Sequence, residues 1–222
     1  MNDGNCVKQL TFGVAFNNMF KLLDSWGEIA DDLLYKNKYF SPEFFSQISS
    51  QYTTERRLFN SEKQHFFVLT ANNLVFTQTI ETSFNDDYAQ FKKRVIDHII
   101  PHILSRYSLV VRRLGMVFTC EWRDDQIKNF ASKYFNPSVT NIMDFRFSKK
   151  EATTKGAVLA DNEDFVNKIF TVGNLSDGIK GISYDYQAHF NPLRQDVRDI
   201  AGSFFTDSLA GFNADVINSS GG

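Results

Sequence analysis

Apolar residues recur at every second position along 108–122, SLVVRRLGMVFTCEW. One set of alternate positions is apolar apart from a single arginine: Val110, Arg112, Leu114, Met116, Phe118, Cys120 and Trp122. A period of two is typical of a strand with one covered face and one open face. Gly115 lies in the middle of the run, where a glycine indicates a bulge or a bend. We therefore predict a long central strand.

An earlier segment repeats this pattern. FGVAFNN (12–18) aligns with LGMVFTC (114–120), which places Gly13 on Gly115 and Phe16 on Phe118. The apolar spacing after the first strand changes to that of a helix and predicts one as far as about Tyr35. Further elements expected in this half are a helix start at 41–43 and two strands, 65–70 and 74–81, joined by a tight hairpin at 71–73.

Two long helices are expected to close the two halves, and both open with Phe-Asn, at 84–85 and 190–191. Asn85 and Asn191 are predicted helix caps, and Pro101 is expected to kink the first helix or to end it near Ile100. The second half also predicts a short helix from Asp124, strands at 142–148, 165–172 and 179–190, and a polar loop at 149–163.

The order strand, helix, strands, long helix thus occurs twice. We predict the α+β class, with a tandem pseudo-repeat forming an antiparallel curved sheet that has its helices on one face. One body would span 8–222, with pseudo-repeats 8–107 and 108–217 and flexible tails at 1–7 and 218–222.

The net charge of -2 argues against a general nucleic-acid binder, which usually has a clear basic excess, but leaves room for a local basic patch. Two cysteines, Cys6 and Cys120, are too few for a disulfide framework or a zinc site. The sequence shows no signal peptide and no run long enough to span a membrane, so we expect a cytoplasmic protein without membrane contact.

Arg112 and Arg113 are adjacent, so an extended strand would direct them to opposite faces, and one of them is expected among Leu114, Met116 and Phe118. A buried arginine needs a partner, for which Asp144, Asp185 or Glu121 could serve. The functional alternative is contact with an anion or a nucleic acid. Lys149 and Lys150 form a second basic pair, expected on loop surface or at the same anion site.

Asp185 shares a strand face with Ser183, Gln187 and His189. This polar face is either solvated or a small site. His98 and His102 have the spacing of a zinc-binding helix, but neither the activating glutamate nor a third ligand is evident, so we predict no metal and no cofactor. The pairs Asp86-Asp87 and Asp124-Asp125 are explained by helix starts.

Two resemblances follow from these residues. The duplicated plan is similar in architecture to the saddle fold of TATA-binding-protein-like domains. The order of features also resembles a sporadically distributed prokaryotic family of unassigned function. That family has an Arg-Leu/Ile-Gly-Leu-Arg-Tyr-type strand and an acidic-aromatic strand before a C-terminal helix, matched here by residues 113–118 and 184–186. Val117 and Cys120 depart from the family pattern, which has arginine and asparagine there. Some members are encoded beside SMC-like ATPases in antiphage defence clusters, which implies a binding subunit and brings no catalytic residues.

Three functions are compatible with this sequence. The leading hypothesis is a non-enzymatic interaction or sensor subunit whose partner is a protein such as an SMC-like ATPase or a nuclease, homo-oligomers being compatible as well. The second is a nucleic-acid-binding saddle that uses Arg112, Arg113, Lys149 and Lys150. The third is an enzyme with a site near Asp185 and His189.

Overall fold

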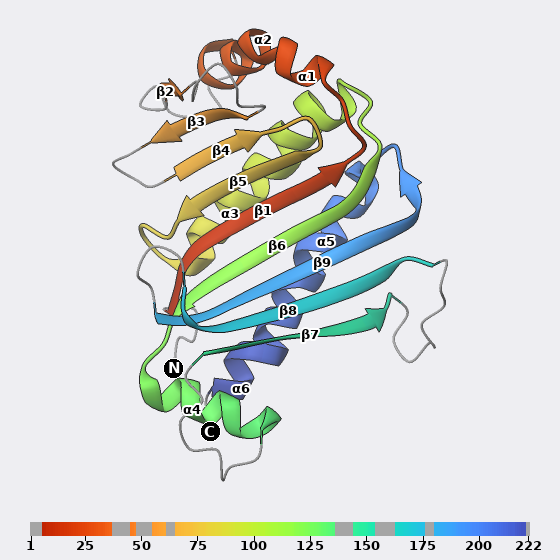
Figure 1. Ribbon diagram of the computed structural model, residues 1–222. Coiled ribbons are helices and arrows are strands. Elements are labelled where there is room, and N and C mark those ends of the chain that lie inside the picture. Colours follow the sequence, from red (N-terminus) through yellow and green to blue (C-terminus); the bar gives the residue numbers. More distant parts are fainter. Residues whose placement is uncertain are drawn as a thin grey trace.

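The computed structural model describes residues 6–36, 45–47, 55–60, 65–135, 144–153, 163–175 and 180–220. A single antiparallel sheet of nine strands, in the order β2-β3-β4-β5-β1-β6-β9-β8-β7, dominates the molecule (Figure 1). The strands are β1 (Val7–Phe16), β2 (Phe45–Gln47), β3 (Arg56–Asn60), β4 (His65–Leu69), β5 (Asn73–Thr79), β6 (Val111–Glu121), β7 (Phe145–Ala152), β8 (Phe165–Asn174) and β9 (Lys180–Arg194).

The sheet has the predicted twofold plan. The opening strands of the two halves, β1 and β6, pair at the centre, and each has the last strand before a long helix on its outer side, β5 beside β1 and β9 beside β6. In the β1–β6 ladder Phe12 pairs with Met116 and Val14 with Leu114, so the two segments that align in sequence pair with each other. The α+β fold class and the tandem pseudo-repeat are confirmed.

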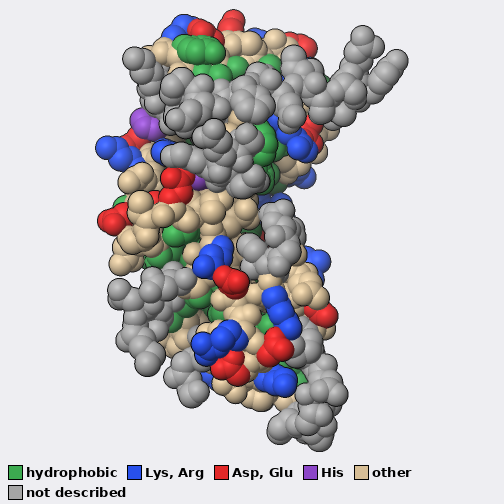
Figure 2. Space-filling model, turned by 90° about the vertical axis from the view of Figure 1, so that its left-hand side faces the viewer, with side chains coloured by type: hydrophobic (Ala, Val, Ile, Leu, Met, Phe, Trp, Pro, Cys, Tyr) green, Lys and Arg blue, Asp and Glu red, His purple; other side chains and the backbone are tan. Residues whose placement is uncertain are grey.

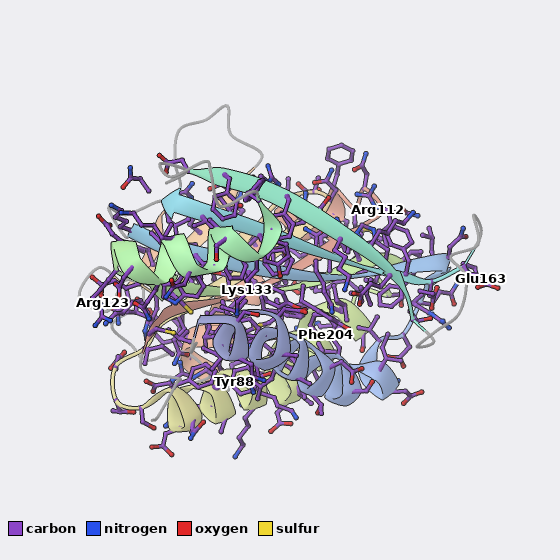
Figure 3. All side chains as sticks on the ribbon, turned by 90° about the horizontal axis from the view of Figure 1, so that it is seen from below. Tyr88, Arg112, Arg123, Lys133, Glu163 and Phe204 are labelled. Carbon is purple, nitrogen blue, oxygen red and sulfur yellow. The ribbon has the colours of Figure 1, made fainter. Side chains whose placement is uncertain are left out.

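The helices cover one face of the sheet. They are α1 (Lys21–Asp24), α2 (Trp26–Asp31), the π-helix η2 (Asp32–Lys36), α3 (Phe84–Arg94), the π-helix η3 (Val95–Ser105), α4 (Asp124–Tyr134), α5 (Arg198–Phe212), the π-helix η5 (Asn213–Ile217) and α6 (Asn218–Ser220). Figures 1 and 3 show α3 and α5 along the same side of the sheet. Trp26 of α2 stacks on Phe67, and Phe130 of α4 packs against Phe170, both on that side. We call it the helix face and the other side the open face.

Phenylalanine fills the space between the sheet and the long helices. Phe12 of β1 stacks on Phe205 of α5 with ring centroids 5.7 Å apart, and Phe118 of β6 stacks on Phe212 at 4.5 Å. All four rings are fully buried. Because burying one such side chain stabilises a fold by about 1.5–3 kcal/mol, the apolar positions of the alternating strands hold the helices to the sheet.

The start of the second long helix differs from the prediction. β9 continues to Arg194, which pairs with Val111 of β6, and α5 begins only at Arg198. The Asn191 backbone N–H donates to Asp164 Oδ1 over 2.6 Å within this extension. In the first half the cap is Ser83, which accepts from the Asp86 N–H, and Asn85 lies inside α3. The shared Phe-Asn pairs are therefore not equivalent positions.

Pro101 does not end its helix near Ile100, the second of the two predicted alternatives. The helix widens into η3 from Val95 and continues to Ser105, and the Arg106 N–H donates to the Pro101 carbonyl, five residues back, over 3.2 Å. A wider turn accommodates a residue that lacks an N–H without breaking the helix.

Several boundaries also differ. The predicted helix start at 41–43 and the first two residues of the predicted strand 142–148 lie outside the described residues. β7 runs to Ala152, so Lys149 and Lys150 belong to a strand and not to the polar loop. Secondary structure includes Val7 and 218–220, both within the segments expected as tails. No helix in the described ranges is long and apolar enough to cross a membrane.

Candidate functional site

The open face of the second half is polar. The ladder β6–β9–β8–β7 places side chains of four strands on it in rows, such as Arg113–His189–Phe165 and Gly115–Gln187–Asn167–Lys150. Their alternate neighbours, such as Met116 and Tyr186, are buried against the helices. The strand alternation thus gathers Arg113, Lys150, Asp185 and His189 on one surface, as the sequence indicated for Asp185 and His189.

Gln187 joins three of these side chains. Its amide Nε2 donates to Asp185 Oδ2 over 2.5 Å, while its Oε1 accepts from Arg113 Nη1 over 3.3 Å. His189 Nε2 lies 3.2 Å from the same Oε1. Because Oε1 can only accept, His189 Nε2 carries the proton in this contact. Gln187 is 7% exposed, so the side chain that connects the other three is itself buried.

A second row crosses the outer strands at Phe165. The His189 ring stacks on Phe165, with centroids 4.4 Å apart and the planes at 9°, and the Lys150 ammonium lies 3.9 Å from the same ring centroid. A cation over an aromatic face is attracted by the ring quadrupole. Phe165 therefore positions Lys150 without neutralising its charge.

The surroundings of Asp185, the single carboxylate of this cluster, disfavour its charged form. Burial raises the pKa of Asp185, although the Gln187 hydrogen bond and the charges of Arg113 and Arg146 oppose that shift. Burial, together with Arg113 and Lys150, lowers the pKa of His189. The cluster thus favours a neutral imidazole and disfavours the charged form of its carboxyl group.

Three cations of this half, Arg113, Arg146 and Lys150, have no carboxylate at ion-pair distance within the described part of the chain. Two lysines of this half are paired, in contrast: Lys149 with Glu151 at 2.5 Å and Lys180 with Asp124 at 2.5 Å. Figure 2 likewise shows basic and acidic side chains close together at the end of the molecule that carries α4. The open face of the second half thus gathers three cations around one carboxylate, Asp185, on the side of the sheet opposite the described helices.

Neither Arg112 nor Arg113 is buried among the apolar residues, contrary to the prediction. A bulge between Val111 and Arg113 leaves Arg112 exposed, on the side of the sheet away from α5 in Figure 3, and Arg113 shares the open face with Gly115. Of the expected partners, Glu121 pairs with Lys8 at 3.3 Å and Asp144 accepts from the Asn174 N–H over 2.9 Å. Asp185, the third, is joined to Arg113 through Gln187 and interacts with its charge. Lys149 lies on the helix face beside Lys168 and is separated from the site.

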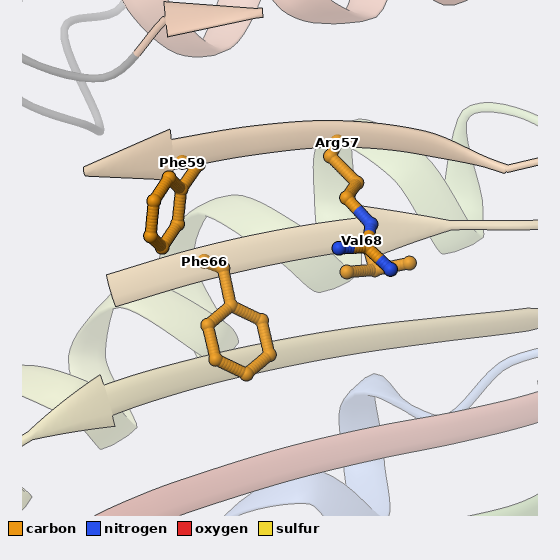
Figure 4. Close-up of a pocket in the computed structure, with 4 residues that line it drawn as sticks. All are labelled: Arg57, Phe59, Phe66 and Val68. Carbon is orange, nitrogen blue, oxygen red and sulfur yellow. The ribbon is translucent and has the colours of Figure 1, made fainter. Parts of the chain in front are cut away.

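The first half of the open face carries a pocket that the sequence analysis missed. Arg57, Phe59, Phe66 and Val68 of β3 and β4 line a hollow of about 270 Å³, in front of the sheet in Figure 4. Phe66 faces Thr77 of β5 as Phe165 faces His189 of β9, and Arg57 faces Val68 as Lys150 faces Asn167. Phe66 and Arg57 are thus the pseudo-symmetric equivalents of Phe165 and Lys150. The sequence feature that could have indicated this pocket is the run 65–69, which has apolar residues on both faces of its strand.

Two other candidates gain nothing from the structure. Gln187 lies between Asp185 and His189 and contacts both of them. The two side chains therefore lack the direct hydrogen bond that an acid–base pair of these residues would need. His98 and His102 belong to η3, and no group of three or more metal-ligating side chains occurs among the described residues. Asp87 accepts from the backbone N–H groups of Glu81 and Thr82, a role at a helix start as predicted.

Comparison with known proteins gives no family. No family model matches the chain, and no curated protein matches it. A solved structure of Methanococcus jannaschii TBP is similar at 8% identity and a TM-score of 0.25, over 92% of this chain and 97% of that one.

Proposed function

We propose that the open face of the sheet binds nucleic acid, with phosphate groups held by Arg113, Arg146 and Lys150. The observation that carries this proposal is the gathering of these cations, none of them within ion-pair distance of a described carboxylate, on the side of β6, β9, β8 and β7 opposite the described helices. Contacts from arginine and lysine to phosphates supply most of the affinity of such proteins. A net charge of -2 is compatible with this because the excess is local.

The remaining groups of the face suit a single strand better than a duplex. Two partly buried polar side chains, Thr11 of β1 and Asn167 of β8, offer neutral hydrogen bonds on this face, Thr11 between the cations and the pocket and Asn167 beside Lys150. The pocket beside Phe59 and Phe66 offers aromatic surface to an unstacked base, and base–aromatic stacking contributes about 1–3 kcal/mol. A duplex keeps its bases stacked and could use only the cations.

The test is fluorescence anisotropy with labelled single-stranded DNA, single-stranded RNA and duplex DNA at several salt concentrations. Three phosphate contacts to a single strand predict a slope of about -2 in a plot of log affinity against log salt. We expect the single strands to bind more tightly than the duplex. Absence of binding at about 50 mM salt, or an affinity independent of salt, would overturn the proposal.

An assembly subunit with a protein partner is the alternative outcome. It would be favoured if the protein ignored all three oligonucleotides but retained a stoichiometric partner, such as an SMC-like ATPase, through nuclease treatment.

A further inference from the structure

The two cysteines of the chain meet at one end of the central strand pair. Cys120, near the end of β6, pairs across the ladder with Val7, the first residue of β1, and Cys6 directly precedes Val7. The side chains of Cys6 and Cys120 are hydrogen-bond partners. Two cysteines so far apart in the sequence are therefore in contact in the fold, which their spacing could not show.

The two thiols differ in environment. Cys120 is fully buried, and this burial, together with the neighbouring Cys6, raises the pKa of its thiol well above the usual value. Cys6 is only partly buried. Because the thiolate is the reactive form and must be reached by the oxidant, Cys6 is the residue that reacts first.

Metal binding does not explain the pair. Zinc sites use three or four protein ligands, and the described residues hold no group of three histidine, cysteine or acidic side chains. Disulfides, in contrast, need only two cysteines whose Cα atoms lie within about 7 Å, a separation that adjacent strands provide.

We propose that Cys6 and Cys120 are a redox pair that closes to an intramolecular disulfide when the protein meets a hydroperoxide. The Cys6 thiolate attacks the peroxide oxygen, breaks the O–O bond and becomes a sulfenic acid, with water or an alcohol as the leaving product. The Cys120 sulfur then attacks the Cys6 sulfur, and the displaced hydroxide takes the Cys120 proton to form water. Two thiols are oxidised and one peroxide is reduced.

The bond would join the start of β1 to the end of β6, across the strand pair at the centre of the sheet. It closes a loop that contains the whole first pseudo-repeat, and long loops lose the most unfolded-state entropy when they are closed. Oxidation would therefore stabilise the whole sheet and not only the first strand.

The test treats the purified full chain with hydrogen peroxide, then alkylates the remaining thiols with a maleimide in denaturant and measures intact and peptide masses. We expect both thiols to be lost together with two hydrogens, a linked peptide containing Cys6 and Cys120, a monomer on a non-reducing gel, and reversal by dithiothreitol. The melting temperature should rise on oxidation in the wild type and not in Cys6→Ser, which changes only the partly buried member of the pair and keeps the buried Cys120.

Three outcomes would overturn the proposal. They are retention of both thiols, oxygen addition at Cys6 while Cys120 still reacts with maleimide in denaturant, and a disulfide between two chains. Because the readouts involve no nucleic acid, they are independent of the function proposed for the open face.

Discussion

Gly13 lies directly opposite Gly115 in the β1–β6 ladder. In two antiparallel strands related by a twofold axis, only a residue on the axis faces its own equivalent. The sequence alignment makes these two glycines equivalent, and the flanking pairs are symmetric as well, with Thr11 opposite Val117 and Ala15 opposite Arg113. The axis of the pseudo-repeat therefore passes between the two glycines, at the floor of the open face.

A first prediction compares Gly115 with Gly181. A Cβ at Gly115 would lie 3.7 Å from Asp185 Oδ1, an ordinary contact, whereas a Cβ at Gly181 would lie 1.8 Å from the Cys120 carbonyl oxygen. Gly115→Ala should change the free energy of unfolding by no more than about 0.5 kcal/mol, with a small gain from reduced unfolded-state entropy. Gly181→Ala should cost about 1–3 kcal/mol through backbone displacement. Urea unfolding followed by tryptophan fluorescence measures both, and equal losses would contradict the described β6–β9 geometry.

A second prediction uses two adjacent lysines that lie on opposite faces. Lys150→Ala removes an uncompensated charge from the open face, whereas Lys149→Ala removes a charge of the helix face that is already paired with Glu151. If each cation holds one phosphate, Lys150→Ala should reduce the slope of log affinity against log salt by about 0.7, and Lys149→Ala should leave it unchanged. Anisotropy titrations measure both slopes. Equal effects of the two substitutions would indicate that only overall charge matters and not this face.

A third prediction concerns Asp185. Burial raises its pKa above the usual 3.8, so the folded protein binds this proton more tightly than the unfolded chain. The resulting penalty is absent below the unfolded-state pKa of about 3.8, grows as the pH rises from there, and is complete above the pKa of the folded state. Asp185→Asn, which can still accept from Gln187, should therefore raise the melting temperature at pH 7 and have little effect near pH 3.5. Melting curves across this pH range test the sign, and a variant less stable than wild type only at pH 7 would contradict it.

The sequence predicted those parts of the fold that depend on periodicity. The alternation in 108–122 and its repeat at 12–18 place β1 and β6, and the same alternation puts Asp185 and His189 on one face. The contacts within a face could not be read in this way. That Gln187 bridges Asp185 to Arg113, or that Lys150 lies over Phe165, depends on strand order and register, which are tertiary properties.

The wrong predictions arose where local preference competed with tertiary contacts. Asn191-Pro192 is typical of a helix start, but here it lies within β9, which continues to the pairing of Arg194 with Val111. Strict alternation predicted a buried arginine, but a single bulge before Arg113 removed the conflict by exposing Arg112. Bulges leave no reliable mark in one sequence, so the side of each arginine could not be assigned beforehand.

The last prediction concerns Lys168, which is 12% exposed on the helix face and forms ion pairs with two carboxylates from different elements. Its Nζ lies 3.0 Å from Glu151 of β7 and 2.9 Å from Asp215 of η5. Burial lowers the pKa of Lys168, but the hydrogen bonds and charges of Asp215 and Glu151 outweigh it and raise the pKa above 10.5. Lys168→Met keeps the apolar stem and leaves both carboxylates without this cation, so it should lower the free energy of unfolding by about 1–3 kcal/mol at pH 7.

Lys149→Met is the matched control, because Lys149 pairs with the same Glu151 but is 59% exposed, and it should cost at most about 0.5 kcal/mol. Since a raised lysine pKa stabilises the fold below the unfolded-state pKa and ceases to do so above that of the folded state, the difference between Lys168→Met and wild type should shrink above pH 10.5. Denaturant titrations at pH 7 and in the alkaline range measure this, and equal costs for the two substitutions would show that the end of the C-terminal helix does not depend on Lys168.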